Sequence, residues 1–191
     1  MVPSIEGKKV EREAVLEAAK LMVVAARTAP KTAGVDDVVS LIVYGSEKNA
    51  IAEKMEEIAA DRKLENFRRD AKNVMDSEAV VLVGLRQNRS SGLNCGACGF
   101  KKCSDFDKTE KKLGKDFEGP QCVFKCLDLG IALGSAVKIA SLLNVDNRIM
   151  YRIGAAAMKL KMLQDATVII GIPISASGKN IYFDRARWPF S

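Results

Sequence analysis

Five cysteines, all between residues 95 and 126, constrain this chain more than any other feature of its sequence. Their spacing is Cys95-x2-Cys98-x4-Cys103-x18-Cys122-x3-Cys126. An odd number of cysteines in one short segment does not suit the disulfide framework of a secreted protein. A reducing cytoplasm, where free thiolates survive to bind metal, is therefore the expected compartment.

The spacing predicts one metal or cluster centre. The CxxC pair lets two thiolates reach a common centre from a tight turn, Cys103 wraps around it, and a distant cysteine closes it. Gly96 and Gly99 follow two of these cysteines, where a tight wrap needs freedom in φ. Four thiolates suit a 4Fe–4S cluster or a structural zinc ion. Zinc sites usually carry two short CxxC knuckles, so the offset third cysteine favours iron–sulfur and leaves zinc as the alternative.

Two residues compete for the place of the distant ligand. If 122–126 is the first turn of a helix, Cys126 lies one turn beyond Cys122 on the same face and can substitute for it. Cys126 can equally be a small buried apolar residue. The candidate metal ligands are therefore Cys95, Cys98, Cys103, Cys122 and Cys126.

Histidine is absent from the 191 residues. Its absence excludes imidazole general bases, Ser-His and Cys-His nucleophile pairs, and histidine ligands to zinc. The composition, 48% apolar and 28% charged, is that of a globular protein.

The net charge of +6 collects in the C-terminal third, much of it in Lys179, Arg185 and Arg187. A dense basic stripe with interleaved aromatic residues, typical of a nucleic-acid surface, is absent, so nucleic acid is not an expected partner. A local anion site, such as one for a cofactor phosphate, fits this pattern better. No membrane span is expected, because the most apolar run, 127–143, is short and carries Asp128 and Lys138.

Hydrophobic periodicity predicts a helix-rich fold around a small sheet. The expected strands are 40–44, 79–85 and 166–174, and the expected helices are 9–28, 47–61, 63–75, 127–143 and 147–160. Ser46 is the expected N-cap of the second helix. The small residues within 127–143 suit either a core helix or half of a subunit interface. The length predicts a single domain, 1–191, with 95–126 as an inserted cysteine-rich segment.

The cysteine segment resembles a known family. CGxCGxxxC, then the aromatic Phe106 and a distant cysteine near Pro120, is similar to the small 4Fe–4S domain of membrane electron-transport complexes and of corrinoid iron–sulfur subunits. The resemblance implies that Cys122 is the fourth cluster ligand.

The remainder resembles the nitroreductase-like flavoproteins. Residues 16–44 look like the opening of that family, 128–140 like its long central helix at the dimer interface, and 171–173 like the end of its last core strand. The resemblance implies an α+β, three-layer fold and a homodimer. It also implies FMN, with Lys179, Arg185 and Arg187 at the phosphate and Arg27 near the flavin edge. The family's N-terminal Arg-Arg-Ser-x-Arg pattern is absent, and Lys8, Lys9 and Arg12 occupy that region.

The whole chain is similar to a group of archaeal and bacterial ferredoxin-domain proteins, through ARTAPKTAGVDD, CGACGF, DNRIM and GIPISASGKNIYFDR. Together these patterns predict a 4Fe–4S redox protein, either an electron carrier or an oxidoreductase with FMN, that works with a redox partner the sequence does not identify. The alternative is a non-enzymatic module, in which a four-cysteine zinc or cluster site supports binding to protein or RNA. Whether the chain is an enzyme stays open, and no catalytic residue can be named.

Overall fold

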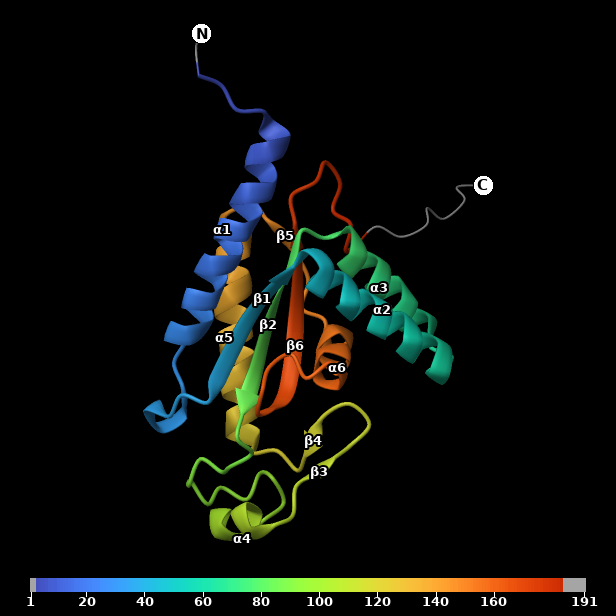
Figure 1. Ribbon diagram of the computed structural model, residues 1–191. Helices are drawn as coiled ribbons and strands as arrows, with labels where there is room; N and C mark the ends of the chain where they lie inside the picture. The colour runs from blue at the N-terminus through green and yellow to red at the C-terminus, as the bar shows by residue number, and fades with distance from the viewer. Residues whose placement is uncertain (1–2, 184–191) are drawn as a thin grey trace, which may run out of the picture.

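The computed structural model describes residues 3–183, and within them a four-stranded antiparallel sheet forms the centre of the protein (Figure 1). The strand order is β1-β2-β6-β5. The strands are β1 Val38–Tyr44, β2 Ala79–Arg86, β6 Ala166–Ser175 and β5 Asp146–Asn147. The three expected strands are therefore present, and the short β5 adds a fourth at the edge.

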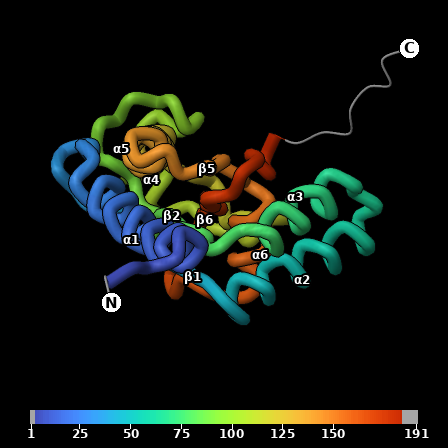
Figure 2. Tube along the Cα trace, turned by 90° about the horizontal axis from the view of Figure 1, so that it is seen from above, coloured from blue at the N-terminus to red at the C-terminus, as the bar shows by residue number. Residues whose placement is uncertain are grey.

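Helices cover both faces of the sheet and make three layers (Figures 1 and 2). One face carries α1 Gly7–Thr28 and α5 Val123–Leu142. The other carries α2 Gly45–Arg62, α3 Glu65–Asp76 and α6 Tyr151–Lys159. The three-layer α+β architecture expected from the sequence is confirmed.

Strand β2 explains why its sequence is apolar without a break. Val81 and Val83 belong to the core under α1 and α5, whereas Val80 and Leu82 belong to the core under the other helices. A central strand covered on both faces has no polar side, so successive residues are all apolar.

Two local expectations were wrong. Helix α2 begins at Gly45, with Tyr44 at its N-cap and no side-chain capping bond, so Ser46 lies inside the helix. The helix expected over 147–160 starts only at Tyr151, because Asp146 and Asn147 pair with the end of β6. Pairing with the sheet overrides the local helical pattern there.

Residues 87–122 connect β2 to α5 and contain the short helix α4, Cys103–Lys108. A two-stranded hairpin follows, formed by β3 Lys112–Leu113 and β4 Glu118–Gly119. This connection lies beyond the end of the sheet at which β2 finishes, at the bottom of Figure 1. The start of α1 and the turn after β6 lie at the opposite end. Among the described helices, none is long and apolar enough to cross a membrane.

Candidate metal centre and a charged pocket at the opposite end

Four of the five cysteines line one small cavity at the lower end of the sheet. They are Cys95, Cys98, Cys103 and Cys122. Leu93, Phe100, Val123 and Phe124 contribute large apolar side chains to the wall. The cavity therefore collects sulfur donors from the long connection and from the first residues at α5.

Backbone geometry sets the first three cysteines around this cavity. Gly96 has a φ of 75° and Gly99 a φ of 88°, backbone angles that residues with a side chain rarely adopt. The amide of Gly99 donates to the carbonyl of Gly96 at 2.9 Å and closes the turn that carries Cys98. The amide of Asn94 donates to Sγ of Cys103 at 3.2 Å, and the Asn94 side chain accepts from the Cys103 amide at 2.8 Å. Amide groups that point at sulfur are the contacts that a metal-bound thiolate needs.

Cys122 stands at the N-cap of α5 and is buried. Burial raises the pKa of its thiol, but hydrogen bonds from the backbone of Lys125 and from Ser91 outweigh this effect and lower the pKa overall. The Ser91 hydroxyl lies 3.7 Å from Sγ of Cys122. These contacts stabilise the thiolate of Cys122 relative to that of an ordinary cysteine, and the thiolate is the form that binds metal.

Cys126 differs from Cys122 in position and in chemistry. It is exposed, and it is not among the residues that line the cavity. Partial burial of its sulfur, together with the neighbouring Cys122, raises the pKa of the Cys126 thiol. Of the two competing cysteines, only Cys122 faces the other three.

The four cysteines can be compared with the ligands that a zinc ion and a 4Fe–4S cluster require. Within residues 3–183, no group of three or more Cys, Asp or Glu side chains can hold a single metal ion. Four sulfurs around one zinc ion lie about 3.8 Å from each other, given zinc–sulfur bonds of about 2.3 Å. A 4Fe–4S cluster takes one thiolate for each iron and so separates its ligands more widely. Both kinds of centre take four thiolates, the donor set that lines this cavity.

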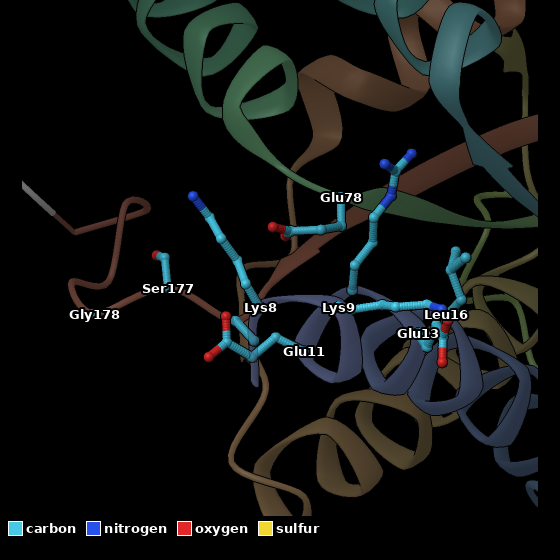
Figure 3. Close-up of a pocket in the computed structure, with 10 residues that line it drawn as sticks. Lys8, Lys9, Glu11, Glu13, Leu16, Glu78, Ser177 and Gly178 are labelled. Atoms are coloured by element: carbon cyan, nitrogen blue, oxygen red, sulfur yellow. The ribbon is translucent and has the colours of Figure 1, made fainter. Parts of the chain in front are cut away.

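A second feature, a pocket of about 880 Å³, lies at the opposite end of the sheet. Figure 3 shows that the start of α1 forms one side, and the turn after β6 the other. Its basic residues are Lys8, Lys9 and Arg12, and Ser177 and Gly178 line the turn. Three carboxylates also line the pocket, those of Glu11, Glu13 and Glu78. Burial raises the pKa of Glu78, which directly precedes β2.

The two predicted flavin residues that the structure describes, Arg27 and Lys179, lie at opposite ends of the sheet. Arg27 pairs with Asp36 near the start of β1, at the cysteine end of the sheet. Lys179 follows the turn that lines the charged pocket, at the other end. Arg185 and Arg187 lie outside the described residues. The sequence had assigned no role to Lys8, Lys9 and Arg12, although their spacing placed them near one another at the start of a helix.

Comparison with known proteins shows the family of this chain. Residues 118–185 match the family described as "Uncharacterized protein containing a ferredoxin domain (DUF2148)". A protein from Archaeoglobus fulgidus is 51% identical over 182 residues, which cover 95% of this chain and 97% of the relative. The chain therefore belongs to this ferredoxin-domain family.

Solved structures with the same fold are nitroreductase-like flavoproteins. Nitroreductase CinD from Lactococcus lactis, in complex with nicotinic acid, has a TM-score of 0.56 and 13% identity, with 98% of this chain and 85% of that chain covered. The NADPH:FMN oxidoreductase from Vibrio harveyi, complexed with NAD⁺, has a TM-score of 0.53 and 11% identity, with 100% and 67% covered. At these identities the likeness shows the fold, and the nitroreductase-like architecture predicted from the sequence is confirmed.

Proposed function

We propose that this chain is an iron–sulfur redox protein whose 4Fe–4S cluster is held by Cys95, Cys98, Cys103 and Cys122. The single observation that carries the proposal is the common cavity that these four cysteines line. The amide that donates to Cys103 and the contacts that lower the pKa of Cys122 support it, because both favour the thiolate. Such a cluster would supply one-electron transfer.

The charged pocket supports FMN as a second cofactor. Lys8, Lys9 and Arg12 provide positive charge for a phosphate, beside the three carboxylates of the lining, and Lys179 follows directly after the pocket's turn. The Vibrio harveyi oxidoreductase of the same fold is named for FMN. A bound flavin would supply the exchange between two-electron and one-electron chemistry. In this proposal the residues of the pocket bind and orient the phosphate, and the cysteine end handles single electrons.

Anaerobic purification, with iron, sulfide and zinc measured on the same sample, tests the cluster. We expect about four irons and four sulfides per chain and a visible absorption that dithionite bleaches. A colourless protein with one zinc ion per chain would overturn the redox proposal, because zinc has no redox chemistry.

Cys98→Ser and Cys126→Ser form a matched pair for the ligand assignment. We expect Cys98→Ser to lose most of its iron, because it removes a thiolate from the cavity, and Cys126→Ser to keep the wild-type content. Equal iron loss in both variants would contradict the assignment of Cys122 over Cys126 as the fourth ligand.

A further inference from the structure

A buried carboxylate connects the two ends of the cysteine segment. Asp37 directly precedes β1, and its side chain is only 2% exposed. It accepts from Arg89 at 2.8 Å and from Lys125 at 2.8 Å. The amide of Arg86 donates to the carbonyl of Asp37 at 2.9 Å, which ties the same residue to the end of β2.

In the sequence, the two partners of Asp37 flank the four cysteines of the candidate metal centre. Arg89 lies where the chain leaves β2, six residues before Cys95. Lys125 lies in the first turn of α5, three residues after Cys122, and its own backbone amide donates to that sulfur. The Ser91 hydroxyl, two residues after Arg89, lies 3.7 Å from the same sulfur. The Asp37 carboxylate thus joins the segment of Arg89 to the segment of Lys125. These two segments must meet for the four cysteines to share a cavity.

The surroundings of Lys125 make the pairing with Asp37 important. The Lys125 side chain is 4% exposed, and its ammonium also donates to the carbonyl of Val35 at 3.2 Å. Asp128, the other acid nearby, lies 4.0 Å away and accepts from Thr32 instead. Removing the Asp37 charge would therefore leave a buried ammonium without its closest counter-ion, which is strongly unfavourable.

We propose that Asp37 is a positioning residue for the metal centre, which closes the cysteine segment by joining Arg89 to Lys125. The proposal rests on the proposed function, since it takes the four cysteines as the ligands. Asp37 touches no cysteine, and it acts through the two residues that it pairs. It lies 88 residues away from Lys125 in the chain, so no local motif reveals the connection.

Asp37→Asn and Asp36→Asn form a matched test, because the neighbours carry the same charge and only Asp37 pairs with Arg89 and Lys125. Asp36 pairs instead with Arg27 and Lys31. In Asp37→Asn we expect iron release to a chelator to be about tenfold faster than in wild type, as for other residues that orient metal ligands. We also expect faster amide exchange in 87–94 and 122–126, with Asp36→Asn close to wild type in both measurements.

Arg89→Gln distinguishes the closure made by Asp37 from a general loss of stability. Arg89 is half-exposed, and the substitution breaks only one of the two ion pairs of Asp37. We expect its faster exchange to be confined to 87–94, with circular dichroism unchanged. If 87–94 and 122–126 of Asp37→Asn exchange at the wild-type rate, with or without metal, Asp37 does not close the cysteine segment and the proposal is overturned. Wild-type protein that binds no iron would instead overturn the proposed function, while exchange in the metal-free chain would still decide the role of Asp37.

Discussion

Two glycines allow α6 to lie directly against β6. A Cβ on Gly154 would stand 1.6 Å from the carbonyl oxygen of Ile169, and a Cβ on Gly171 would stand 2.1 Å from the Ile153 side chain. Neither glycine has a positive φ, so both are required by contact distance and not by backbone conformation. At these positions a single methyl group decides how closely helix and sheet can pack.

Gly154→Ala should lower the free energy of unfolding by about 1–3 kcal/mol or more, because the backbone of β6 cannot yield to the new methyl. Gly130→Ala is the control, since a Cβ there meets nothing within 4 Å. It should raise stability by about 0.5–1 kcal/mol through helix propensity. Urea unfolding in dilute solution measures both. Equal effects would show that the close approach of α6 to β6 is wrong.

At the scale of elements, helix α5 has two apolar faces. Its buried face packs against α1 and the sheet through residues such as Ala132, Ala136 and Ala140. Its outer face leaves Leu127 53% exposed and Ile131 45% exposed, one turn apart. The alternatives of core helix and subunit interface are therefore compatible, because the buried face fills the core and the opposite face remains exposed. We expect the outer face to form the homodimer contact.

The double variant Leu127→Lys with Ile131→Glu should convert a dimer to a monomer without unfolding it, because charge replaces apolar area at the contact. Leu113→Lys is the control, since Leu113 is 73% exposed but lies on the β3–β4 hairpin. Sedimentation velocity measures the change. A wild-type protein that stays monomeric, or a variant that still dimerises, would contradict the α5 interface.

The whole molecule places its two candidate sites at opposite ends of the sheet. The cysteine cavity lies beyond Arg86 at one end of β2, and the charged pocket lies beside Glu78 at the other. Eight residues of antiparallel strand, at about 3.4 Å each, place these ends about 27 Å apart. Because β2 and β6 are antiparallel, the end of β6 lies beside the start of β2, and the turn after β6 is therefore at the end of the sheet away from the cysteine cavity.

Lys8→Ala combined with Arg12→Ala should weaken FMN binding about tenfold or more, because charge-assisted contacts to a phosphate are lost. Lys20→Ala is the control, on the same helix but paired with Glu17 outside the pocket. A fluorescence titration of FMN measures the affinity. Unchanged affinity in the double variant would remove the pocket from the flavin proposal.

Acid should weaken the closure made by Asp37. Burial raises the pKa of its carboxyl, but Arg89 and Lys125 lower it more, so the folded pKa lies below 3.8. A lowered carboxylate pKa contributes stability above that value, and the contribution is lost as the pH falls through the folded pKa. The protection of amides in 87–94 and 122–126, measured relative to the intrinsic exchange rate at each pH, should therefore fall below about pH 4, and less so in Asp37→Asn.

The sequence by itself determined the chemistry of this protein's donors and the kind of layers that it forms. The cysteine spacing and the lack of histidine are read directly from the sequence. The unbroken apolar run of β2 predicts a strand that is buried on both faces. Only the tertiary structure decided that Cys122 faces the cavity, that Asp37 meets Lys125, and that the start of α1 meets the turn after β6. These contacts join residues far apart in the chain, and packing of whole helices and strands, not local propensity, brings them together.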